Sequence, residues 1–160
     1  MNKRIIDLLA LFLLMLTTGV FWGTWFTLTR KLETFSAAEF IHIGQTIISN
    51  VAVPMRIILP SCIVFMFLSL WMAENKKSVA FKAGVFSLAL IIGVLLVTLL
   101  VLVPIDNQIR DWTEATIPSQ WTDLRATWNS FHTLRTWMSL TAFGCFSGYL
   151  LFVNRNPQHN

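Results

Sequence analysis

Charged residues are scarce in this chain. Only 12% of its 160 residues are Asp, Glu, Lys or Arg, whereas 55% are hydrophobic, and the mean hydropathy is +0.64. A soluble domain of this length would expose too much apolar surface to water. The composition therefore indicates an integral membrane protein in contact with membrane lipid, and the length allows one domain over residues 1–160.

Several functional signatures are also missing from the sequence. It has no Cys/His cluster with metal-ligand spacing, no glycine-rich phosphate loop, no dinucleotide fingerprint and no nucleophile elbow, so we expect neither a metal nor a cofactor. Its basic residues are not interleaved with aromatic ones, which argues against a nucleic-acid partner. Its two cysteines, Cys62 and Cys145, lie in apolar segments, where a small buried hydrophobe is favoured over a disulfide.

Four apolar stretches predict an all-α, integral membrane four-helix bundle. The expected spans are residues 5–28, 52–73, 80–105 and 133–153. The basic start resembles a signal peptide, but the uncharged run 8–29 is long and no small-x-small site closes it, so we expect a retained first helix. Ser36 and Glu39 form a capping-box pattern, which predicts a helix near Ala37 that lies on the membrane surface or continues into the second span.

The remaining polar segments, 29–56 and 104–135, fall on the same side of a four-span topology. They predict a polar cap of short helices over one face of the bundle. Within it, Asn107 is expected to cap the third helix near Pro104, and Ser119 to cap a helix that starts at Gln120. The basic residues at the other side flank the spans openly, which favours both termini in the cytoplasm.

One stripe of side chains in the second polar segment is unusual. Spacings of 4, 3, 4 and 3 place five residues along one helix face, namely Trp121, Arg125, Trp128, His132 and Arg135. His132 is either a functional residue, as a general base or a metal ligand, or a structural hydrogen-bonding residue. Each arginine either anchors the fold through a nearby acid or stabilises an anionic ligand. Each tryptophan either belongs to an interfacial belt or flanks a flat aromatic ligand.

Three stretches carry a family resemblance. GVFWG at 19–23, VPIDNQIRDW at 103–112 and RATWNSFHTLR at 125–135 resemble the signatures of the anthrone oxygenase-like family of small four-helix membrane proteins, many of them bacterial. Asp106 stands where Asn is common in that family. The resemblance implies a bacterial inner-membrane location and, from the fungal members, oxidation of an anthrone with O₂ and no evident cofactor.

Two hypotheses follow. In the first, the protein binds and oxidises a flat, hydrophobic phenol, anthrone or quinone-like molecule, and His132 removes a proton while Arg125 and Arg135 stabilise the anion. The ligand-binding candidates are Trp121, Trp128, Asn107, Asp106, Trp112 and His42. In the second, the chain is a non-catalytic accessory or oligomer-forming subunit of a membrane complex. Its glycines, such as the pairs Gly84 with Gly93 and Gly144 with Gly148, would then pack against neighbouring helices.

Overall fold

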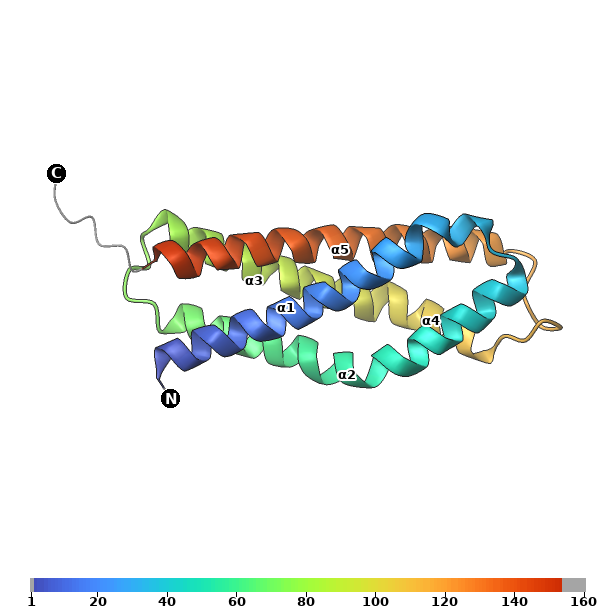
Figure 1. Ribbon diagram of the computed structural model, residues 1–160, viewed down its shortest axis with the longest axis horizontal. Helices are drawn as coiled ribbons and strands as arrows, with labels where there is room; N and C mark the ends of the chain where they lie inside the picture. Colours follow the sequence, from blue (N-terminus) through green and yellow to red (C-terminus); the bar gives the residue numbers. More distant parts are fainter. Residues whose placement is uncertain (1, 154–160) are drawn as a thin grey trace.

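The computed structural model describes residues 2–153, and within this range it is helical and has no strands. The elements are α1 (Lys3–Thr27), η1 (Thr29–Thr34), α2 (Ala37–Trp71), α3 (Val79–Val97), the π-helical η2 (Thr98–Leu102), α4 (Val103–Asp111) and α5 (Trp121–Phe152). Four long helices lie side by side, with α4 continuing α3, and the start of α1 and the end of α5 lie at the same end (Figure 1). The predicted all-α bundle is confirmed.

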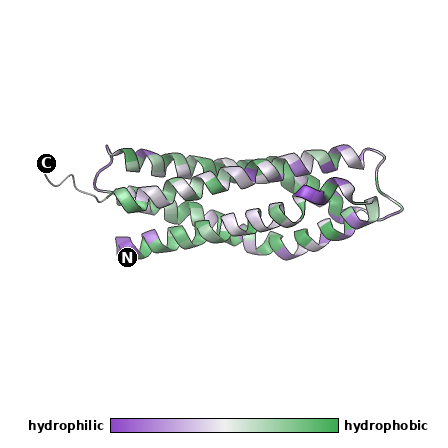
Figure 2. Ribbon diagram, turned by 45° about the horizontal axis from the view of Figure 1, so that its top comes forward, coloured by the Kyte–Doolittle hydropathy of each residue, from purple (hydrophilic) through white to green (hydrophobic). Residues whose placement is uncertain are grey.

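The apolar surface of the bundle is compatible with a membrane. Three helical segments are long and apolar enough to cross one: Lys3–Thr34, Ala37–Trp71 and Val79–Asp111. Large apolar side chains face outward on them, such as Leu8, Ile57 and Leu100, as contact with lipid requires. Within the described residues α5 is not among the three, because its first half carries the charged and polar stripe. Hydrophilic residues lie at both ends of the bundle, including the end opposite the termini (Figure 2).

The helix predicted near Ala37 continues directly into the second span. The capping box at its start is confirmed, since the Ser36 N–H donates to Glu39 Oε2 at 2.8 Å and the Glu39 N–H donates to Ser36 Oγ at 3.4 Å. α2 has 35 residues, which at about 1.5 Å per residue makes it roughly 50 Å long, more than the ~30 Å of a hydrocarbon core. The polar end of the bundle is therefore built from extended helix ends together with η1 and α4.

The third helix does not end at Pro104, and the expectation that Asn107 caps it is wrong. The chain passes through the π-helical turn η2, where the Val103 N–H donates to Thr98 O, and continues as α4 to the C-cap Trp112. Pro104 lies at the start of α4, where its missing N–H is tolerated. Asn107 consequently lies inside a helix.

Ser119 does not cap α5 either. The N-cap is Gln120, one residue later, and it makes no side-chain capping bond. Backbone carbonyls accept hydrogen bonds from two amides of the first turn instead. The Trp121 N–H donates to Pro118 O and the Asp123 N–H donates to Gln120 O, both at 3.1 Å. The Ser119 hydroxyl donates to the Gln120 side chain at 3.2 Å. Because these backbone bonds already occupy the free amides, a serine cap is not needed.

Small polar side chains join the helices at the terminal end. Ser87 Oγ of α3 donates to Ala142 O of α5 at 2.7 Å, and the Tyr149 hydroxyl donates to Ser69 O of α2 at 3.0 Å. Ser69 Oγ also donates to Asp7 Oδ1 of α1 at 2.6 Å. Hydrogen bonds of this kind between helices fix their register in an apolar surrounding.

Both cysteines are free, as the apolar setting of the two residues predicts. Cys62 is buried in α2, where its thiol lies 3.6 Å from the sulfur of Met66. Cys145 is partly exposed on α5. Cys62 thus acts as a small hydrophobe in the core.

Gly84 allows α3 to approach α2 and α5 closely. A Cβ at this position would lie 2.7 Å from Leu70 Cδ2 and 2.8 Å from Tyr149 Cγ, whereas a Cβ at Gly148 would meet nothing within 4 Å. We expect Gly84→Val to lower the melting temperature in detergent micelles, because overpacking costs about 1–3 kcal/mol. Gly148→Val is the control, since it makes the same change of helix propensity. Equal shifts in both variants would contradict the close packing at Gly84.

Candidate functional site

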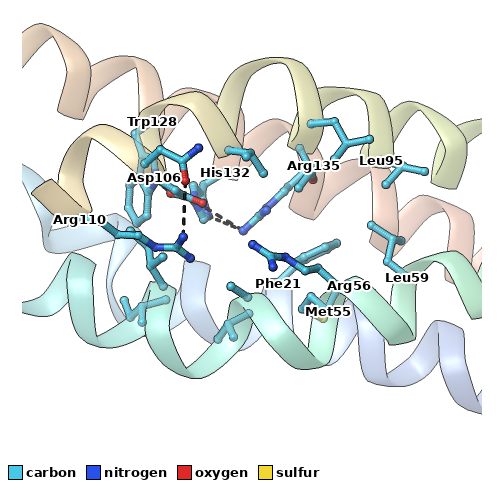
Figure 3. A pocket seen from close by; sticks show the side chains of 18 of the residues that line it. Phe21, Met55, Arg56, Leu59, Leu95, Asp106, Arg110, Trp128, His132 and Arg135 are labelled. Carbon is cyan, nitrogen blue, oxygen red and sulfur yellow. Dashed lines mark hydrogen bonds between the residues drawn. The ribbon is translucent and has the colours of Figure 1, made fainter.

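A cavity of about 370 Å³ lies in the bundle. Its lining comes from α1, α2, the α3–η2–α4 helix and α5, and comprises Phe21, Ile47, Ile48, Val51, Ala52, Met55, Arg56, Leu59, Pro60, Leu95, Thr98, Leu99, Val103, Asp106, Asn107, Arg110, Trp128, His132 and Arg135. Aliphatic side chains such as Leu59 and Leu95 lie at one end, and Asp106 and Trp128 lie at the other (Figure 3). The cavity therefore combines an apolar wall with a polar one.

The α2 wall of the cavity lies at a bend in the helix. Pro54 and Pro60 both lie inside α2, and the helix bends near its middle in Figure 1. An internal proline removes a backbone hydrogen bond and kinks a helix. The bend separates the first half of α2 from α1, which itself crosses from α2 toward α5 (Figure 1). The cavity-lining residues 47–60 flank this bend.

Asp106 and Trp128 tie α4 to α5 at the polar wall. Trp128 Nε1 donates to Asp106 Oδ1 at 2.8 Å, and the indole, 2% exposed, packs edge-on against Phe40 with centroids 6.1 Å apart. No other side chain in residues 2–153 donates a hydrogen bond to the carboxylate. One carboxylate oxygen is thus fixed by the indole, and Oδ2 is left without a donor from the described chain.

His132 and Arg135 form a buried pair on the next turn of α5. They are 5% and 9% exposed, and Arg135 Nη2 lies 2.9 Å from His132 Nδ1 and 3.5 Å from Nε2, so the bond to Nδ1 is the shorter. A guanidinium has donors only, so Nδ1 must accept. In the neutral ring the proton is therefore on Nε2. The lone pair that a general base would use is already engaged by Arg135.

The Arg135 guanidinium has unused donor capacity. Its carbon lies 4.4 Å from the centre of the Phe21 ring, a cation–π contact that fixes the side chain between α1 and α5. Its Nε is buried and has no hydrogen-bond partner in the described part of the chain. A buried donor without a partner is costly. An acceptor supplied by a ligand would remove that cost.

Two further arginines line the same cavity. Arg56 comes from α2 and Arg110 from α4, and Figure 3 shows their guanidinium groups pointing toward the space that Arg135 also faces. Arg110 and Arg135 both attract the Asp106 carboxylate electrostatically. With His132 neutral, three arginines and one aspartate leave the cavity lining with two positive charges. This arrangement favours an electron-rich or anionic ligand.

Comparison with known proteins identifies the family. The family model described as anthrone oxygenase matches residues 45–145, more than half of the chain. The chain belongs to the anthrone oxygenase family. No curated protein and no solved structure matches it. All ionisable residues of the cavity lie within the segment that matches the anthrone oxygenase family, whereas Phe21 precedes it.

In this member of the anthrone oxygenase family, only part of the stripe on α5 faces the cavity. Trp128, His132 and Arg135 line the cavity, as do Asp106 and Asn107 of α4. Trp121 and Arg125, the first two residues of the stripe, lie outside it. The structure thus brings together five of the predicted site residues.

Arg125 holds η1 against α5. Its Nη1 donates to Leu32 O at 3.3 Å and to Phe35 O at 3.1 Å, and its guanidinium lies 4.7 Å from the centre of the Trp121 ring. Trp121 in turn packs on Phe40 with centroids 5.9 Å apart. Through these contacts Arg125 holds η1 and the start of α5 together at the polar end of the bundle.

Trp112 and His42 also lie outside the cavity lining. Trp112 is buried as the C-cap of α4, and its carbonyl accepts from Gln45 Nε2 at 2.9 Å. The same Gln45 amide donates to Ile109 O at 3.0 Å, so Gln45 of α2 caps the end of α4. His42 is exposed on α2. Among the described residues no group of three His, Cys, Asp or Glu side chains gathers in one place.

Most of the cavity lining was absent from the predicted site, and three of these residues are informative: Arg56, Arg110 and Phe21. Arg56 gave a signal, because the uncharged stretch after it is too short for a full span and places it close to the bundle. Arg110 lies four residues after Asp106 on α4, and that helix was predicted to end at Pro104. Phe21 gave no signal, because a phenylalanine in an apolar span is ordinary.

Proposed function

We propose that this member of the anthrone oxygenase family oxidises a flat, hydrophobic phenol, anthrone or quinone-like molecule with O₂ in the cavity. The carrying observation is a single cavity that pairs apolar walls with a carboxylate, Asp106, and a buried donor pair, His132 and Arg135. Such a site accepts an aromatic body and stabilises negative charge at one edge of it.

The geometry favours Asp106 over His132 as the base. The His132 lone pair at Nδ1 accepts from Arg135, whereas Asp106 Oδ2 has no donor in the described chain. His132 then acts as a donor through Nε2–H, and together with Arg135 it stabilises the developing oxyanion. Arg125, which was expected to share this role, is assigned to anchoring because both its acceptors are carbonyls outside the cavity.

For an anthrone substrate, the oxidation requires only the anthrone and O₂. Asp106 removes one proton from the ring CH₂, and the electron pair moves to the carbonyl oxygen as an enolate. The enolate carbon gives electrons to O₂ and forms a C–O bond, and the resulting peroxide anion takes a proton. Loss of the second C–H proton breaks the O–O bond and releases water. One CH₂ and one O₂ thus yield one C=O and one H₂O.

The location of the protein is part of the proposal. The bundle crosses the membrane with its terminal end in the cytoplasm, and the resemblance to bacterial proteins points to an inner membrane. A hydrophobic substrate dissolved in the bilayer would reach a cavity whose walls belong to two apolar segments, Ala37–Trp71 and Val79–Asp111. Membrane lipid then surrounds the protein and also holds the dissolved substrate.

Oxygen consumption by the purified protein tests the proposal. We expect anthrones or hydroquinones to give O₂ uptake well above their spontaneous oxidation, with the quinone as product. Heat-denatured protein in the same detergent is the control for autoxidation. A full panel of anthrones and hydroquinones that gives only the spontaneous rate would exclude the oxidation.

The second candidate is the accessory or oligomer-forming subunit. It is favoured by Gly144 and Gly148 on α5, where a Cβ would meet nothing within 4 Å, so that no other described residue packs against this small-residue face. Purification in mild detergent followed by mass analysis separates the two. A stoichiometric partner chain that is lost on substitution of Trp121 or Arg125 would favour the subunit.

A further inference from the structure

The cavity carries more positive charge than the proposed oxidation uses. His132 and Arg135 suffice to stabilise an enolate, and Asp106 serves as the base. Arg56 has no role in that scheme and no hydrogen bond or ion pair to any other described residue. Arg110 makes only a long bond of 3.5 Å to Asn107 Oδ1. Of these two guanidinium groups, Arg56 has no ionic partner among the described residues, and Arg110 has only the Asp106 carboxylate, which Arg135 also attracts.

Arg56 and Arg110 are both exposed side chains that also line the cavity. Arg56 belongs to Ala37–Trp71 and Arg110 to Val79–Asp111, two segments that are apolar enough to cross a membrane. An arginine in such a segment is expected to face a protein cavity and to pair with an anion or a carbonyl. Both line the cavity, and their guanidinium groups approach it from opposite helices (Figure 3). The described chain thus supplies one carboxylate, Asp106, to a cavity lined by three guanidinium groups.

We infer that Arg56 and Arg110 form a binding subsite for an acidic group, a carboxylate or a phosphate, attached to an apolar body that fills the cavity. The planar donor fork of arginine matches both anions. The acidic group comes either from the aromatic ligand itself or from a phospholipid headgroup. The inference rests on the proposed function only in that the cavity holds a ligand, and not on the oxidation.

A pair of fluorescent probes tests the subsite. Anthracene-2-carboxylate and 2-(hydroxymethyl)anthracene share a ring system and differ in charge. In an uncharged detergent, we expect the wild-type protein to bind the carboxylate about tenfold more tightly than the alcohol, because the carboxylate accepts charge-assisted hydrogen bonds. This difference in affinity should become smaller at high salt. Arg56→Gln and Arg110→Gln should each remove most of the preference and leave alcohol binding unchanged. Arg30→Gln, at an exposed arginine of η1 outside the cavity, should change neither.

Added phosphatidylglycerol distinguishes the two sources of the acid. Competition with the carboxylate probe in the wild type but not in Arg56→Gln assigns the subsite to lipid phosphate, whereas a preference without competition assigns it to the acid of the aromatic ligand. Equal affinity for both probes in the wild type overturns the inference, and so does an equal loss of both in the arginine variants. Oxygen uptake with a neutral anthrone is measured in parallel, so that loss of the oxidation and loss of the subsite are separate results.

Discussion

Asp106→Asn is expected to abolish most of the O₂ uptake. The amide has the same shape and keeps an oxygen that can accept from Trp128 Nε1, a bond of 2.8 Å that ties α4 to α5. It cannot take a proton from the substrate. Loss of a general base typically lowers the rate about 10²–10⁴-fold. The measurement is the initial rate of anthrone-dependent O₂ consumption per folded molecule, corrected for spontaneous oxidation.

Asp111→Asn is the matched control for this substitution. Asp111 lies on the same helix and is exposed outside the cavity, so the same chemical change should leave the rate unaltered. Binding of the unreactive quinone product should persist in Asp106→Asn, because the cavity walls are intact. A normal rate in Asp106→Asn together with an inactive His132→Gln would return the role of base to His132.

The stripe on α5 shows how far spacing alone predicts a site. Its five residues do share one helix face, as spacings of 4, 3, 4 and 3 indicate. From Trp121 to Arg135, however, the helix rises about 20 Å, which is longer than one site. The C-terminal part of the stripe, from Trp128 to Arg135, lines the cavity. The N-terminal part, Trp121 and Arg125, contacts η1 and the start of α2. Periodicity gives the face of a helix, but the neighbours along that face depend on the tertiary fold.

The helical architecture was largely predictable, because long apolar runs and a capping box at Ser36 are local signals. The missed features depend on contacts between distant segments. Pro104 was expected to end a helix, but the chain continues through the preceding π turn into α4. Gln45 caps α4 from another helix, 64 residues before the carbonyl of Ile109. No pattern within either segment indicates that pairing.

Arg135→Gln is expected to lower turnover strongly and to release the His132 ring. Arg135 is 9% exposed, donates to His132 Nδ1 at 2.9 Å and has a further buried Nε without a partner in the described chain. In the proposed reaction it stabilises the enolate, and removal of one such donor typically costs about 10²–10³ in rate. We expect kcat to fall more than the affinity for the quinone product, because the charge develops in the transition state.

Arg125→Gln provides the contrast, because it removes the same group from the same helix outside the cavity. Arg125 donates only to the carbonyls of Leu32 and Phe35, so its loss should lower the melting temperature while turnover per folded molecule changes little. Arg135→Lys refines the result, since it keeps the charge but loses the planar donor fork. A lysine variant as slow as Arg135→Gln would show that donor geometry is required, and one near the wild-type rate would show that charge alone suffices. If Arg125→Gln and Arg135→Gln lose turnover equally, the division of the stripe into an anchor and a catalytic half is wrong.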